Sequence, residues 1–156
     1  MLSRESLDQV NREIAKYPPE RKSSAVMATL RIAQEEHSWL SVPLMDYVAE
    51  LLGMRPIQVY EVATFYSMYD LKPVGKHKIS ICTNVSCMLC GSDAIVKHLE
   101  KRLGIKLGET TPDGRYTLKE VECLAACGGG PMFQIGKTYY ERLTPQKVDE
   151  ILGGLE

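Results

Sequence analysis

The first half of the chain carries apolar residues at the spacing of helices. Along residues 1–70, apolar side chains recur at every third or fourth position, which places them on one face of a helix. The clearest stripe runs from Leu44 to Leu52, with Pro43 in the first turn and Gly53 after the last. Pro18-Pro19 ends an earlier helix. We therefore predict a helical bundle over residues 1–74, with helices at residues 7–17, 26–37, 44–52 and 57–69.

The last of these helices differs from the others. Residues 57–69 are apolar on nearly every side rather than along one stripe. Such a helix is either buried on several sides or lies against another protein. The pattern leaves both possibilities open, and docking of a partner by the bundle is an expectation.

The pattern changes near Pro73 and Gly75, where we place the boundary of a second domain at residues 75–156. Alternation of polar and apolar residues predicts strands, a longer period predicts helices, and Gly136-Lys137 suits the turn of a hairpin. Thr144-Pro145 is typical of a helix start. The predicted order is strand 78–82, helix 92–103, strand 116–122, hairpin strands 132–135 and 138–141, and a helix ending at Gly153. This is an α+β protein in which a helical bundle precedes a thioredoxin-like βαβ–ββα domain.

Composition and charge narrow the function. The chain has 156 residues, of which 44% are hydrophobic and 25% charged, and its net charge is −1. Neither half has the basic excess that binding to nucleic acid requires. No stretch approaches the roughly 20 apolar residues of a membrane span. The opening residues, from Met1 to Asp8, lack an apolar signal core, so we expect a reducing, cytoplasmic location.

The cysteines are the candidate chemistry. All five lie between residues 82 and 127, as a Cys-x4-Cys-x2-Cys group and a Cys-x3-Cys group. An odd number of cysteines in a reducing compartment argues against a disulfide framework. Thiolates grouped in this way favour a soft metal. The candidate ligands are Cys82, Cys87, Cys90, Cys123 and Cys127.

The predicted strands bring the two groups together. Cys82 would end the first strand, Cys87 would sit in the loop entering the next helix, and Cys123 would end the parallel strand. Parallel strands of a βαβ unit end at one edge of the sheet, where four thiolates can hold zinc or an iron–sulfur cluster. The spacing does not exclude zinc. Backbone N–H groups near Cys87 and the glycines at 128–130 after Cys127 favour a [2Fe–2S] cluster, and the Cys-x2-Cys-x2-Cys run of many [4Fe–4S] sites is absent.

Cys90 is one cysteine too many for this site. Cys82, Cys87 and Cys90 with Cys123 would match the plant-type ferredoxin spacing. Alternatively, Cys87 and Cys90 could form a redox Cys-x-x-Cys pair at a helix start. Neither alternative uses Cys127 or the glycines that follow it, so we favour Cys82, Cys87, Cys123 and Cys127 as the ligands.

The motifs resemble those of the thioredoxin-like [2Fe–2S] family. The resemblance rests on Cys82-x4-Cys87-x-Leu-x-Gly91-Ser, on Cys123-Leu-x-x-Cys127 followed by Pro131-Met, and on the upstream segment 59–68. Within that family the chain is similar to the 24 kDa subunits (the E subunits in bacteria) of NADH:quinone oxidoreductases, which belong to respiratory complex I. The family's cluster ligands fall on the same four cysteines, and similarity to thioredoxins implies a cis bond before Pro131.

The resemblance also implies partners. A flavoprotein subunit of the same complex would bind NADH, FMN and a [4Fe–4S] cluster, and this chain would place its [2Fe–2S] cluster near the flavin. The chain lacks a Gly-x-Gly-x-x-Gly turn, a phosphate loop and a nucleophile with a paired base. We therefore expect an electron-transfer subunit of an oxidoreductase with no catalytic residues of its own, peripheral on the inner face of the plasma membrane through the complex.

Three alternatives stay open. Related subunits occur in NAD-reducing hydrogenases and formate dehydrogenases, and the motifs do not separate these from complex I. A stand-alone thioredoxin-like ferredoxin would need little beyond the cluster domain, so the helical first half argues against it. A zinc-binding interaction module is the third.

Overall fold

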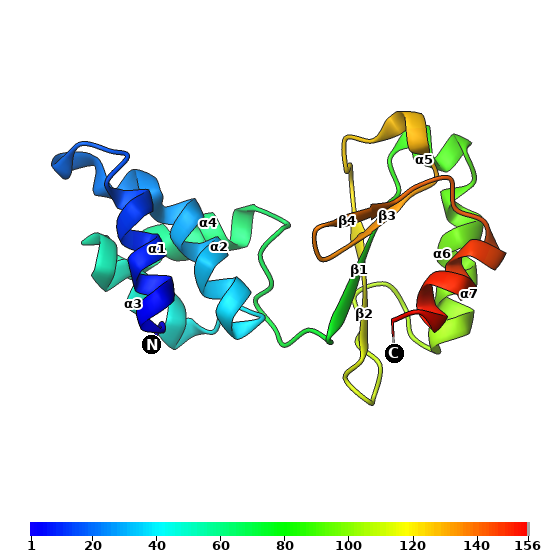
Figure 1. Cartoon of the computed structure of the whole chain (residues 1–156), viewed down its shortest axis with the longest axis horizontal. Helices are drawn as coiled ribbons and strands as arrows, with labels where there is room; N and C mark the ends of the chain where they lie inside the picture. The colour runs from blue at the N-terminus through cyan, green and yellow to red at the C-terminus, as the bar shows by residue number, and fades with distance from the viewer. Residues whose placement is uncertain (156) are drawn as a thin grey trace. The chain divides into compact units, whose positions relative to one another are not determined.

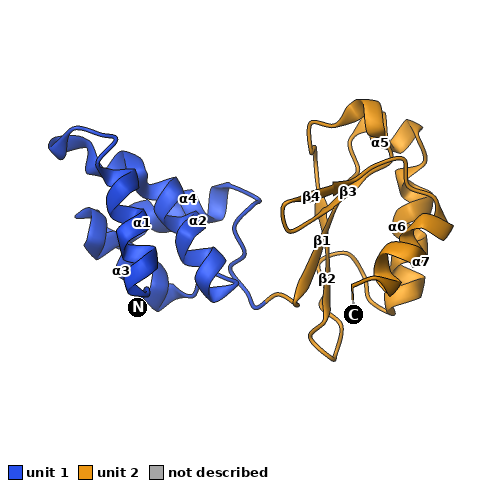
Figure 2. Cartoon of the chain, in the orientation of Figure 1, with its two compact units in different colours: residues 1–73 blue, residues 74–156 orange. Residues whose placement is uncertain are grey.

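The computed structural model describes residues 1–155, which form two compact units. The first unit covers Met1–Pro73 and the second begins at Val74, as the two colours of Figure 2 show. Each unit has a hydrophobic core of its own. Because each core is built from side chains of one unit, the two are described separately.

The first unit consists of helices (Figure 1). Its core contains Val10, Leu30, Val48 and Val59, one from each α-helix, all at most 1% exposed. The elements are α1 (Arg4–Ile14), a 3₁₀ segment η1 (Pro19–Ala25), α2 (Val26–His37), α3 (Val42–Leu52) and α4 (Pro56–Phe65). The expected helical N-terminal half is confirmed, including Pro43 in the first turn of α3 and Gly53 at its left-handed end.

Two predicted helix ends are wrong. The helix expected at 7–17 ends at Ile14, and Tyr17 N instead donates to Ile14 O in a tighter turn. The helix expected at 57–69 ends at Phe65, because Tyr66 is extended. Beyond it, Tyr69 Oη donates to Met27 O over 2.9 Å. This contact with the start of α2 holds the chain on a path that differs from a continued helix.

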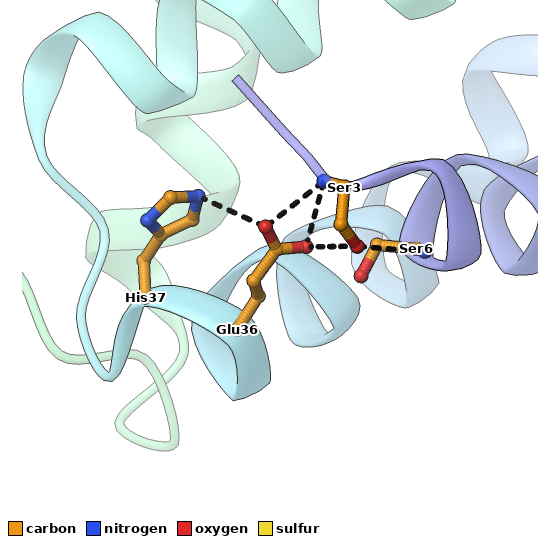
Figure 3. Close-up of polar contacts among 4 residues, drawn as sticks. All are labelled: Ser3, Ser6, Glu36 and His37. Carbon is orange, nitrogen blue, oxygen red and sulfur yellow. Dashed lines mark hydrogen bonds and ion pairs between the residues drawn. The ribbon is translucent and has the colours of Figure 1, made fainter.

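A polar cluster fastens the start of α1 to the end of α2 (Figure 3). Ser3 caps α1, since its Oγ accepts a hydrogen bond from Ser6 N over 3.2 Å. The Ser3 amide and hydroxyl both donate to the Glu36 carboxylate, at 2.9 and 3.1 Å. His37 Nε2 lies 3.7 Å from the same carboxylate. Glu36 therefore joins two helices that are distant in sequence.

The second unit is a four-stranded sheet with helices α6 and α7 on one side (Figure 1). The strand order is β2-β1-β3-β4, in which β1 and β2 are parallel and β3 is antiparallel to both β1 and β4. The elements are β1 (His77–Cys82), α5 (Val85–Leu89), α6 (Ser92–Leu103), β2 (Tyr116–Val121), a 3₁₀ turn η2 (Cys127–Gly129), β3 (Phe133–Ile135), β4 (Thr138–Tyr140) and α7 (Pro145–Gly153). The predicted α+β class and βαβ–ββα order are confirmed.

Local sequence signals account for most of these elements. Gly104 ends α6 with a φ of +69°, which favours glycine. Gly136 has a φ of +59° in the β3–β4 turn, as expected for a hairpin that begins its turn with glycine. Thr144 Oγ1 accepts a hydrogen bond from Lys147 N over 3.2 Å and so caps α7. Between sheet and helices, the core includes Leu99, Leu118, Phe133 and Val148, each 0% exposed.

Candidate metal centre

The end of the sheet places the first cysteine between two neighbouring strands. Cys82 is the last residue of the central strand β1 and is paired in register with Val121, the last residue of β2. Its amide donates to Met132 O over 3.2 Å, on the side of β3. Cys123 follows two residues after the end of β2. The parallel strands thus end together, as the sequence predicts, although Cys123 lies beyond the strand and not at its last position.

Cys87 belongs to a helix that the sequence analysis missed. It lies in the short helix α5, whereas a loop was expected there. Five residues are too few for a periodic pattern to show. Within α5, Cys87 is 1% exposed, while Val85 and Leu89 are 58% and 79% exposed. The helix therefore turns Cys87 inward and presents apolar side chains outward.

Cys82 and Cys87 form a buried thiol pair. Burial raises the pKa of Cys87 to about 11, and a hydrogen bond with Cys82 and the charges of Cys82 and Cys127 raise it further. Cys82 is 3% exposed, and its Sγ lies 3.7 Å from Glu122 O. A desolvated thiol is hard to ionise unless a cation compensates its charge, and a bound metal ion does so directly. These two sulfurs suit a metal better than solvent.

The other two candidate ligands are exposed. Cys127 begins the turn η2 and lies close enough to Cys87 to interact with it electrostatically. Cys123 Sγ accepts a hydrogen bond from Ala125 N over 3.2 Å, and Ala125 has the unusual φ of +57°. Among residues 1–155, no group of three or more His, Cys, Asp or Glu side chains forms a ready-made metal site. The four-cysteine ligand set stays a prediction.

The surroundings of the buried pair fit an anionic cluster. A Cβ on Gly130 would lie 3.5 Å from Cys87 Sγ, so glycine lets the backbone come close to that sulfur. The Gly130–Pro131 bond is cis, as the resemblance implied. Ser92 Oγ, at the start of α6, is fully buried and has no hydrogen-bond partner in the described chain. A buried hydroxyl donor without an acceptor is unusual in proteins, and a bound anionic group would supply one.

Cys90 lies at the margin of this site. It is exposed at the end of α5, and its Cβ would lie 3.5 Å from a Cβ on Gly130. All five cysteines are free thiols in the described chain, so Cys87 and Cys90 are not joined. The role of Cys90 as ligand, redox partner or neighbour is not decided by this position.

The sequence analysis missed one segment beside the cysteines. Arg142 N donates to Gly129 O over 2.7 Å, and Leu143 N donates to Pro131 O over 3.0 Å. The hairpin register could have revealed it. Phe133 pairs with Tyr140, so the residues just before β3 must lie opposite those just after β4.

The amino-acid sequence is similar to curated proteins along nearly its whole length. The E subunit of the NADH-quinone oxidoreductase of Rickettsia conorii is 48% identical over 156 residues, which is 99% of this chain and 93% of that protein. An E subunit of the NADH-quinone oxidoreductase of Rhizobium meliloti is 46% identical over 145 residues, covering 93% of this chain and 85% of the relative.

A solved structure shares the fold. The air-oxidized state of a NAD+-reducing [NiFe]-hydrogenase matches with a TM-score of 0.70 and 20% identity, over 81% of this chain and 22% of that longer chain. None of the helices in residues 1–155 combines the length and apolar character needed to cross a membrane. The model of the thioredoxin-like [2Fe–2S] ferredoxin family matches residues 10–156, which is most of the sequence. The chain therefore belongs to the thioredoxin-like [2Fe–2S] ferredoxin family.

Proposed function

We propose that this chain is the electron-transfer subunit of an NADH–quinone oxidoreductase and holds one [2Fe–2S] cluster on Cys82, Cys87, Cys123 and Cys127. The observation that carries the proposal is the buried Cys82–Cys87 pair at the end of the sheet, in a chain of this family. The names of relatives that are 46–48% identical over more than nine tenths of the chain support the assignment to this complex.

The protein's own residues bind the cluster and control its surroundings. When bound, a [2Fe–2S] cluster takes up or releases one electron at a time. Cys82 and Cys87 supply sulfurs from which water is excluded. The Ala125 amide, which donates to Cys123 Sγ, stabilises negative charge on that sulfur. No proton acceptor or nucleophile is required of this chain, because hydride chemistry would occur on the partner.

The proposed partner is the flavoprotein subunit of the same complex, which would carry FMN, a [4Fe–4S] cluster and the NADH site. We propose that the first unit docks against another subunit through its exposed apolar residues. Ile57, Phe65 and Met68 are 53%, 80% and 49% exposed. Large apolar side chains gathered on one segment are typical of protein interaction sites. Assembly with that complex would hold the chain on the cytoplasmic face of the membrane.

Affinity purification of the tagged full chain from its host tests the assignment. We expect the flavoprotein of an NADH–quinone oxidoreductase to co-purify, together with the red-brown colour of the cluster. Recovery of hydrogenase subunits would favour the second candidate, which the fold shared with the NAD+-reducing hydrogenase suggests. A colourless, zinc-containing protein would contradict both.

The docking face has its own test. Phe65→Ser should weaken co-purification of the partner without changing the colour of the chain. Tyr17→Ser is the matched control, because Tyr17 is an aromatic residue of the same unit, 40% exposed, that lies outside the 57–68 segment. Equal recovery of the partner with both variants would show that the face is not used.

A further inference from the structure

The connection between β4 and α7 lies against the loop that follows Cys127 (Figure 1). Two backbone hydrogen bonds join them, from Arg142 N to Gly129 O and from Leu143 N to Pro131 O. Lys147 Nζ donates to Glu141 O over 2.6 Å, and Leu143 is buried in the core of the second unit. Residues 141–143 are therefore fixed relative to the 127–131 loop.

The side chain of Glu141 fills the space beside Gly129. A Cβ added to Gly129 would lie 2.7 Å from both Cγ and Oε2 of Glu141, which is closer than real Cβ atoms approach. The backbone of Gly129 is not left-handed, so glycine is needed there for space rather than for conformation. The neighbouring Gly128 is different, because a Cβ there would meet no atom of the described chain within 4 Å.

This contact places a negative charge close to the proposed cluster. Gly129 is two residues from Cys127, and the next residue, Gly130, approaches Cys87 Sγ. A [2Fe–2S] cluster with four thiolates has a formal charge of −2 when oxidised, and one electron makes it more negative. A fixed carboxylate nearby repels that added charge, so it disfavours reduction.

We propose that Glu141 sets the reduction potential of the cluster, and that its carboxylate, held over Gly129, lowers that potential. The inference rests on the proposed function, since it requires the cluster. It concerns the one-electron reduction only: the electron comes from the chemical reductant of a titration, no bond is formed or broken, and no proton is transferred.

Redox titration of the reconstituted full chain, followed by the EPR signal of the reduced cluster, tests the proposal. Glu141→Gln keeps the size of the side chain and removes its charge, so the midpoint potential should shift to more positive values. Glu141→Asp keeps the charge and should lie between wild type and Glu141→Gln. The control is Glu150→Gln, which removes a charge from an exposed position on α7, nine residues further along the chain.

Gly129 supplies an independent variant. Gly129→Ala should push the end of the Glu141 side chain away from the loop and shift the potential in the same direction. Gly128→Ala shows what stiffening of the loop does by itself, and its shift should be smaller. Adding Gly129→Ala to Glu141→Gln should then change little, because the two variants remove the same charge from the same place.

Each outcome decides the question. A Glu141→Gln potential equal to that of Glu150→Gln would overturn the proposal, as would additive shifts in the double variant. Loss of the cluster in both Glu141→Gln and Gly129→Ala would also overturn it, since the contact would then be structural. Failure of the wild-type chain to assemble any cluster would instead refute the proposed function.

Discussion

At the scale of single residues, Glu36 makes the stability of the first unit depend on pH. Hydrogen bonds from Ser6 and from the amide and hydroxyl of Ser3, together with the charge of His37, lower the pKa of Glu36 from its ordinary value of 4.5 (Figure 3). Because the folded pKa lies below the unfolded one, the stabilisation is complete above pH 4.5 and is lost as the pH falls through the folded value.

Glu36→Gln should therefore lower the melting temperature at pH 7, and the difference from wild type should shrink as the pH falls below 4.5. Circular-dichroism melts between pH 7 and pH 3 measure this. Glu50→Gln on α3, which removes an exposed carboxylate of the same unit, provides the control. A difference that stays constant across this range would mean that the ionised carboxylate contributes nothing.

The candidate site also shows what residue patterns reveal and what they omit. The spacing of the cysteines is enough to single out Cys82 and Cys87, because grouped thiols are rare outside metal sites. Their burial, and the contact of Glu141 with Gly129, could not be predicted in this way. Both depend on how α5 and the β4–α7 connection fold back onto the end of the sheet, and no motif of the sequence encodes that.

At the scale of elements, the cap of α7 should contribute measurably to the second unit. Thr144→Ala removes the acceptor for Lys147 N and should lower the free energy of unfolding by about 0.5–2 kcal/mol. Ser41 is the matched control, because it occupies the same position before α3 but its side chain makes no capping bond within the described residues. Ser41→Ala should stay within about 0.5 kcal/mol of wild type in urea unfolding. Equal losses for the two variants would contradict the assigned role of Thr144.

Elements with clear end signals were predicted best. Helix α6 begins and ends where the sequence indicated, since Gly104 supplies a left-handed stop. Helix α4 ends four residues early because bonds to α2, such as that from Tyr69 to Met27, outweigh local helix propensity. Such tertiary contacts have no local signature.

At the scale of the whole molecule, the two separate cores predict separate unfolding. Leu30 is fully buried in the first unit, so Leu30→Ala should reduce the stability of that unit by about 2–5 kcal/mol. The thermal bleaching of the cluster, which reports on the second unit, should stay close to that of wild type. Differential scanning calorimetry with the visible absorbance recorded in parallel compares the two. A cluster that bleaches earlier by the same amount would show that the units unfold together.

The direct test of the central claim is a metal and sulfide analysis of the full chain after anaerobic reconstitution, on wild type and five single Cys→Ser variants. We expect two irons and two sulfides per wild-type chain, full retention in Cys90→Ser, and loss of the intact cluster in the variants of Cys82, Cys87, Cys123 and Cys127. Zinc in place of iron, or a Cys127→Ser chain that keeps its cluster while Cys90→Ser loses it, would contradict this assignment.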